Sequence, residues 1–216
     1  IKNGGADRVS INPQTMNDNV LETIGRKHTV KQTEEALTLA KEIGFKNINM
    51  DLIAGLPSDS LESFKNTVDR VVDMDPESIT VHTLCLKRSA TLNGGDLSWL
   101  KDGDTASNMV DYAKEKLEKA EYYPYYMYRQ SKMVGNLENV GYSKVGYEGL
   151  YNVYIMDETH SILACGATAV TKLRKYNDSV IERIYNFKYP YEYISRFEEQ
   201  MARKERIYSF YGEQNK

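Results

Sequence analysis

Cysteine is scarce in this 216-residue sequence, and so are the features that mark secreted or membrane proteins. The two cysteines, Cys85 and Cys165, lie far apart in the chain and form no CxxC pair. This excludes a disulfide-rich scaffold and favours a reduced, cytoplasmic protein. No apolar run approaches the ~20 residues of a membrane span, and no signal-peptide pattern is present, so we expect no membrane partner.

An excess of positive charge is also missing. Lysine and arginine together number 28 against 31 aspartate and glutamate residues, which gives a formal net charge of -3. A protein that binds nucleic acid usually carries a basic surplus or a basic patch. We therefore expect no nucleic-acid partner.

Three stretches of the sequence alternate between polar and apolar residues: Arg8–Gln14, Asn47–Ile53 and Ser78–Leu84. Side chains alternate across a strand, so each stretch predicts a strand with one polar and one apolar face. An ordinary buried parallel strand is apolar on both faces. The polar face is therefore expected to line a wet cavity and to hold a ligand. The side chains expected to face that cavity are Ser10, Asn12, Gln14, Asn49 and Asp51.

Helices are predicted between these strands. Thr29–Gln32 has the pattern of a capping box that opens one helix, and Gly44 supplies its end. Asp59–Glu62 has the pattern of a second box, and Pro76 ends the helix that follows it. Strands and helices alternating at about thirty-residue spacing predict parallel βαβ units, hence an α/β fold. Ligands in such folds sit at the carboxyl ends of the strands, which here are Gln14, Asp51–Pro57 and Leu84–Cys85.

The second half of the chain has a different, α+β pattern. The aromatic run Tyr122–Tyr128 predicts a buried strand, and a last helix is expected from about Pro190. Tyr151–Met156 and Ser161–Cys165 predict the two strands of a hairpin. We expect two domains, with residues 1–88 forming half of a barrel and residues 89–216 forming an α+β carboxyl-terminal region.

Three strands cannot close a barrel, so we expect further strands to precede Ile1. The edge formed by Arg8–Gln14 would then carry unpaired backbone groups. On this basis we expect self-association of the chain, or cover of this edge by another segment.

The residues at the strand ends resemble a known family. Ser10–Gln14, Gly25–His28 and Asn49–Pro57 resemble consecutive motifs of the oxygen-independent coproporphyrinogen III oxidases (coproporphyrinogen dehydrogenases), a radical S-adenosylmethionine (SAM) family. Motifs in the second half look like the HemZ branch in particular. These motifs are Tyr128–Gln130, Gly135–Tyr142 and Leu163–Ala167.

The resemblance implies a partial radical SAM (TIM-like) barrel and a set of cofactor-binding residues. Gln14 matches a glutamine that contacts SAM, Arg26 an arginine that binds its carboxylate, and Asp51 an aspartate that holds its polar groups. Ile53 and Cys85 match positions beside the adenine or a second cofactor molecule. The parent protein would also carry a [4Fe-4S] cluster fed by an electron donor. It would convert coproporphyrinogen III, its porphyrinogen substrate, to protoporphyrinogen IX by oxidative decarboxylation of two propionates.

The family's Cys-x-x-x-Cys-x-x-Cys cluster loop is not found in the sequence, and we expect it to precede Ile1. The chain by itself is therefore expected to hold no cluster and to be inactive. An alternative is a haem-binding chaperone or carrier, since relatives with the same barrel are thought to traffic haem. A phosphate-binding barrel is a more distant alternative, because Gly166-Ala167 is a poor phosphate loop.

Overall fold

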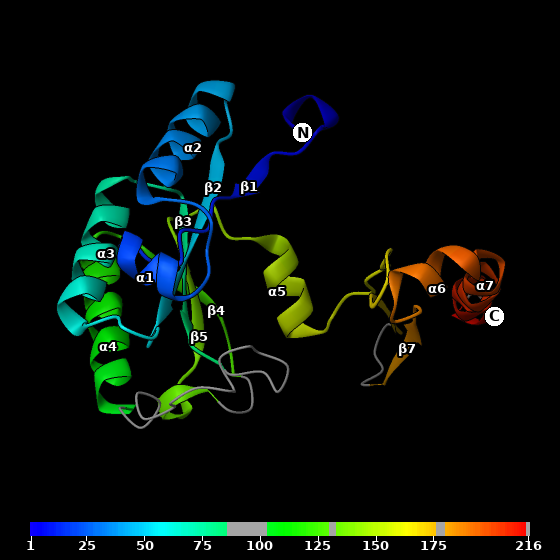
Figure 1. The fold of residues 1–216 in the computed structure, drawn as a ribbon. Coiled ribbons are helices and arrows are strands. Elements are labelled where there is room, and N and C mark those ends of the chain that lie inside the picture. The colour runs from blue at the N-terminus through cyan, green and yellow to red at the C-terminus, as the bar shows by residue number, and fades with distance from the viewer. Residues whose placement is uncertain (86–102, 130–132, 176–179, 215–216) are drawn as a thin grey trace. The chain divides into compact units, whose positions relative to one another are not determined.

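The computed structural model describes residues 1–85, 103–129, 133–175 and 180–214 (Figure 1). The chain divides into two compact units, Ile1–Gly149 and Leu150–Lys216. The boundary predicted between residues 88 and 89 lies outside the described residues, so that division stays a prediction. No helix in the described part of the chain is both long and apolar enough to cross a bilayer.

The first unit is built on one five-stranded sheet in the order β1-β2-β3-β5-β4. Three strands, β1 (Arg8–Ser10), β2 (Asn47–Ala54) and β3 (Ser78–Thr83), run parallel to one another. The next strand, β5 (Asn139–Ser143), is antiparallel to both β3 and β4 (Tyr123–Tyr128). The three predicted parallel strands and the α/β class are thus confirmed.

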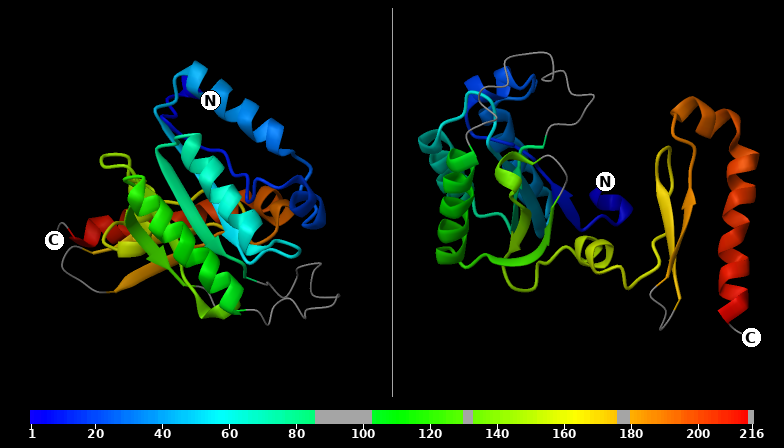
Figure 2. Two further views of the ribbon diagram at one scale, coloured as in Figure 1. Left: turned by 90° about the vertical axis from the view of Figure 1, so that its left-hand side faces the viewer. Right: turned by 90° about the horizontal axis from the view of Figure 1, so that it is seen from below.

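Four helices cover one face of this sheet, as the left view of Figure 2 shows. They are α1 (Asp18–Thr23), α2 (Val30–Ile43), α3 (Leu61–Asp73) and α4 (Gly103–Lys119). The capping box at Thr29 is present, and Gly44 ends α2 in the left-handed conformation that glycine tolerates best (φ 91°). The second cap differs from the prediction by one residue, because Ser60 and not Asp59 accepts the Ser63 N–H at the start of α3.

The hydrophobic core lies between the helices and the apolar face of the strands. Ile48, Met50 and Leu52 of β2 have no exposed surface and pack in one cluster with Phe64 of α3 and Met109 of α4. The predicted orientation of β2 is confirmed, since its apolar residues face the helices. Asn49 and Asp51 consequently face the opposite side of the sheet.

The first strand is shorter than predicted and ends at Ser10. Ile11 donates its N–H to the Asn49 carbonyl, and the next donor in a parallel ladder would be residue 13. Pro13 has no N–H, so Gln14 donates to the Asp51 carbonyl instead (3.0 Å) with a left-handed φ of 69°. Asn12 is exposed beside this irregularity, and its predicted place facing the cavity stays a prediction.

The second unit contains the hairpin β6 (Val170–Arg174) and β7 (Ile181–Tyr185), followed by α6 (Pro190–Ser195) and α7 (Phe197–Gln214), visible in the right view of Figure 2. The predicted hairpin is wrong, because residues 150–157 form the helix α5 (Leu150–Asp157). Aromatic and β-branched content suggested a strand there, but the segment lacks a regular polar–apolar alternation. The final helix was predicted as one and is present as two, α6 and α7.

Self-association of the chain is expected at β1, which forms one edge of the sheet. Because Ile11 donates to β2, the N–H of Ser10 points away from the sheet and is open to a second chain. Sedimentation velocity over a hundredfold range of concentration (about 1–100 µM) should show concentration-dependent association. Ser10→Pro removes that donor and should abolish it. A wild-type chain that stays a monodisperse monomer over the whole range would contradict the prediction.

Candidate functional site

A row of residues crosses the polar face of the sheet from β2 to β4. Asp51 pairs with Thr80, Thr80 with Gly141, and Gly141 with Tyr126. Residues paired across neighbouring strands project on the same face, so this row forms one continuous surface. It lies on the side of the sheet opposite the helices of the first unit.

The centre of this surface is the carboxylate of Asp51. The Asn49 amide nitrogen donates to Asp51 Oδ1 at 2.7 Å, and His82 Nε2 lies 3.7 Å from Asp51 Oδ2. Burial, the largest single influence, raises the pKa of the Asp51 carboxyl, but His82, Asn49 and Thr80 together outweigh it. The net pKa lies below the ordinary value of 3.8, so Asp51 is an ionised acceptor at neutral pH.

Backbone hydrogen bonds bring two more predicted site residues to Asp51. Gln14 N–H donates to the Asp51 carbonyl at 3.0 Å, and Ile53 N–H donates to the Gln14 carbonyl at 2.9 Å. The Gln14 side chain is 7% exposed, and its amide donates to the Asn12 carbonyl at 3.4 Å. The irregularity at Pro13 therefore places Gln14, Asp51 and Ile53 next to one another.

The two remaining predicted residues, Arg26 and Cys85, lie on other segments of the chain. Cys85 is half-buried just beyond β3 and forms an isolated bridge with Met133. Arg26 is exposed on the loop between α1 and α2, after the left-handed Gly25. His28 ties that loop to the end of β1 through the Pro13 carbonyl (3.2 Å). The geometry thus unites three of the five predicted residues and leaves the Arg26 guanidinium in an exposed loop.

Two tyrosines of β4 belong to this surface although we expected their run to be a buried strand. The strand is confirmed, but the rings of Tyr126 and Tyr128 are only half-buried, and they lie 6.3 Å apart with planes 7° from parallel. Tyr128 also has an edge contact with His82. The signal that could have revealed them is their two-residue spacing, which puts both rings on one face.

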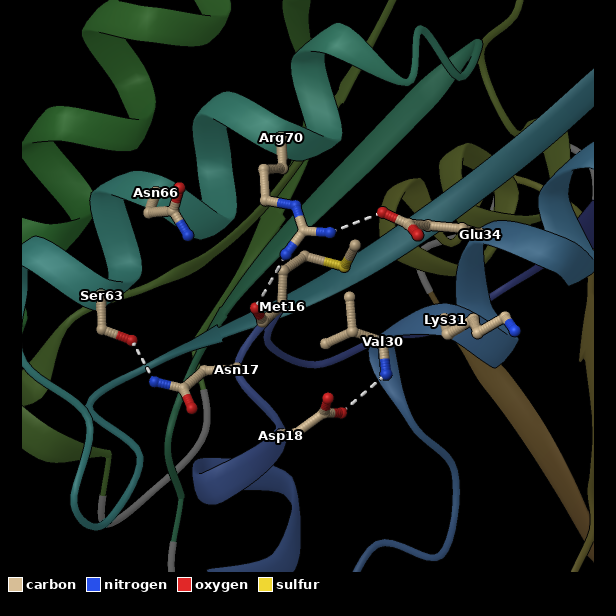
Figure 3. A pocket seen from close by; sticks show the side chains of 9 residues that line it. All are labelled: Met16, Asn17, Asp18, Val30, Lys31, Glu34, Ser63, Asn66 and Arg70. Atoms are coloured by element: carbon tan, nitrogen blue, oxygen red, sulfur yellow. Dashed lines mark hydrogen bonds and ion pairs between the residues drawn. The ribbon is translucent and has the colours of Figure 1, made fainter.

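A separate hollow of about 610 Å³ lies on the helix side of the sheet (Figure 3). Several of its polar groups are engaged with one another: Arg70 pairs with Glu34, and the Asn17 amide donates to Ser63 Oγ at 2.9 Å. These contacts brace α1, α2 and α3 against each other. The hollow is lined by Met16, Asn17, Asp18, Val30, Lys31, Glu34, Ser63, Asn66 and Arg70.

Comparison with known proteins identifies the class of protein to which the chain belongs. Residues 1–71, which contain Gln14, Arg26, Asp51 and Ile53, match the family model of the radical SAM superfamily. The fold matches the structure of coproporphyrinogen III oxidase (HemN) from Escherichia coli, a radical SAM enzyme, with a TM-score of 0.68. That match covers 92% of this chain and 45% of HemN at 18% sequence identity. The chain belongs to the radical SAM superfamily.

Within that superfamily the chain is similar to HemZ and HemW proteins. It is 40% identical to the oxygen-independent coproporphyrinogen-III oxidase-like protein HemZ of Bacillus subtilis, over 89% of this chain and 38% of HemZ. It is 27% identical to the haem chaperone HemW of Escherichia coli, over 76% of this chain and 40% of HemW. The chain thus spans less than half of the length of each relative.

Radical SAM proteins use SAM together with a [4Fe-4S] cluster. The described residues suit SAM better than they suit the cluster. The Asp51 side chain is 21% exposed, so an ionised acceptor is within reach of a ribose hydroxyl or an ammonium group. No group of three His, Cys, Asp or Glu side chains suited to a metal occurs among the residues with described positions. A cluster would need thiolates from elsewhere.

The lowered pKa of Asp51 predicts how stability responds to acid. A carboxyl with a depressed folded-state pKa stabilises the fold above its unfolded value, and this contribution is lost as pH falls through the folded value. Urea denaturation between about pH 6 and pH 2 should show the wild type losing more unfolding free energy on acidification than Asp51→Asn.

Asp59→Asn is the matched contrast. Burial raises the pKa of Asp59, so its ionisation on going to higher pH opposes folding, and the wild type should lose stability relative to Asp59→Asn as pH rises. Equal acid dependence in the wild type and Asp51→Asn would contradict the assignment of an ionised Asp51.

Proposed function

We propose that this chain supplies the SAM-binding strand ends of a cytoplasmic radical SAM enzyme that converts coproporphyrinogen III to protoporphyrinogen IX. The observation that supports it best is the ionised Asp51 on the polar face of β2, inside the region that matches the superfamily model. The similarity to HemZ and the fold of HemN favour the porphyrinogen substrate. The electron donor for the cluster would be a further partner.

Each proposed binding residue has a chemical role that its side chain suits. Asp51 accepts hydrogen bonds from cofactor hydroxyl or ammonium groups, and the Arg26 guanidinium pairs with the methionyl carboxylate. Gln14 offers an amide, and Ile53 and Cys85 offer apolar contact beside the adenine or a second cofactor molecule. When bound, SAM and the cluster supply the radical chemistry that removes carbon dioxide from two propionate chains.

Haem carriage is the second candidate function, favoured by the similarity to HemW proteins. A carrier would need an axial ligand for haem iron, such as histidine, cysteine or tyrosine. His82 and Tyr128 both lie on the polar face of the sheet. Titration of haem into the chain separates the two proposals. Carriage requires the Soret band of haem to shift on binding, and this shift should be lost in His82→Ala or Tyr128→Phe.

Replacing Asp51 or Arg26 with alanine should weaken SAM binding in the cluster-containing parent protein. A hydrogen bond to a charged group is typically worth ~1.5–3 kcal/mol, so roughly ten- to hundredfold lower affinity is expected for each variant. Isothermal titration with SAM gives the comparison. Asp69→Ala, on the helix side, and Lys27→Ala, beside Arg26, are matched controls that should bind normally. Unchanged affinity in both test variants would show that these residues only brace the fold.

The chain alone should bind no iron–sulfur cluster, because Cys85 and Cys165 cannot supply the usual three or four thiolates. Reconstitution with iron and sulfide under anaerobic conditions should leave it colourless in the visible range. A brown product with broad absorption near about 400 nm that survives desalting would overturn this expectation.

A further inference from the structure

Gly141 of β5 lies directly beneath the ring of Tyr126. A Cβ atom built on Gly141 would stand 1.8 Å from Tyr126 Cε1 and 2.4 Å from Cδ1, far inside any permissible contact. Only glycine therefore lets the ring lie against the backbone of the neighbouring strand. The ring is turned along the row of paired residues toward Thr80 and away from the strand's outer edge.

The hydroxyl of Tyr126 begins a series of hydrogen bonds that ends at Asp51. Tyr126 Oη lies 3.4 Å from Thr80 Oγ1, and Thr80 Oγ1 donates to Asn49 Oδ1 at 3.2 Å. The Asn49 amide nitrogen then donates to Asp51 Oδ1 at 2.7 Å. Thr80 Oγ1 donates to Asn49 Oδ1 in this arrangement, which leaves its lone pairs to accept from the Tyr126 hydroxyl.

These directions fix the orientation of the Asn49 amide. Its oxygen accepts from Thr80, so its nitrogen must face the carboxylate, whereas a flipped amide would set oxygen against oxygen. Burial raises the pKa of Tyr126 to about 12, so the phenol keeps its proton at neutral pH and remains a donor. Asn49 is 5% exposed and Thr80 2% exposed, so water does not readily replace either partner.

We propose that Tyr126, seated over Gly141, is a positioning residue that orients the Asp51 carboxylate through Thr80 and Asn49. The part of this inference that concerns ligand binding rests on the proposed role of Asp51 toward SAM. The orientation of Asp51 itself is a property of the ligand-free chain. Tyr126 and Gly141 would thus be required for the site although neither touches Asp51.

The first experiment follows the Asp51 carboxyl by ¹³C NMR during an acid titration of the 216-residue chain. The titratable groups that face Asp51 are His82 of β3 and Tyr126 and Tyr128 of β4. Tyr126→Phe should raise the pKa of Asp51 toward its ordinary value, because the Asn49 donor is no longer held in place. Thr80→Val should raise it as well, but this variant also removes the Thr80 hydrogen bond that itself lowers the Asp51 pKa. Thr80→Ser keeps the hydroxyl and should keep the wild-type value.

Tyr128→Phe is the matched control, since it removes a hydroxyl from the ring stacked beside Tyr126 but outside the series. It should leave the Asp51 titration unchanged. An unchanged titration in Tyr126→Phe, or an equal shift in Tyr128→Phe, would overturn the inference. Gly141→Ala, which displaces the ring, should raise the pKa of Asp51 likewise, and if that variant does not fold, Tyr126→Phe decides.

The second experiment separates this inference from the proposed function. SAM titrated into the cluster-containing parent should bind roughly threefold more weakly to Tyr126→Phe than to the wild type and normally to Tyr142→Phe, whose ring lies in the helix-side core. A shifted Asp51 titration with normal SAM binding in both Asp51→Ala and Tyr126→Phe would refute the SAM site and leave the positioning role standing. Weak SAM binding in Asp51→Ala with an unshifted titration in Tyr126→Phe would refute the positioning role alone.

Discussion

The burial of Ile48, Met50 and Leu52 against α3 and α4 fixes the orientation of every other side chain on β2. A slip of one residue in this strand would carry three apolar side chains to the polar face and bring Asn49 and Asp51 into the core. Fully burying a side chain of this size contributes about 1.5–3 kcal/mol, so three of them outweigh the hydrogen bonds on the opposite face. The packing on the helix side therefore determines where the carboxylate of the candidate site stands.

The same strand connects the site to its neighbours in the sheet. Paired residues place Thr80 beside Asp51, and the missing N–H of Pro13 forces Gln14 to take the hydrogen bond that continues the ladder. Both the N–H and the carbonyl of Gln14, whose backbone is left-handed, then form hydrogen bonds to β2. The interruption of the hydrogen-bond ladder at Pro13 thus places Gln14 and Ile53 next to Asp51.

Much of this framework could be predicted from the sequence. The two-faced alternation of β2 gave its orientation correctly, since a period of two leaves only one register that buries the apolar side chains. The capping box at Thr29 and the glycine at position 44 located α2 for equally local reasons. The helix at Leu150–Asp157 was missed because its residues favour strands and show no helical periodicity to oppose that preference.

The candidate site was predicted only in part, for a related reason. Gln14, Asp51 and Ile53 share one strand pair, so their proximity follows from the parallel order of β1 and β2. Tyr126 reaches the site through β5, whose pairing with β3 joins residues about sixty positions apart in the sequence. No local pattern specifies that partner, and the space above Gly141 is visible only once the two strands are side by side.

The most direct test of the central claim is to map where SAM binds on the isotopically labelled chain by NMR. Added SAM should shift the resonances of Asp51 and Ile53, on the polar face of the sheet, and of Gln14, which is hydrogen-bonded to both through its backbone. Resonances of Ser63 and Arg70, which line the hollow on the helix side, should stay in place. Shifts confined to Ser63, Arg70 and their neighbours, with Asp51 unaffected, would contradict the account.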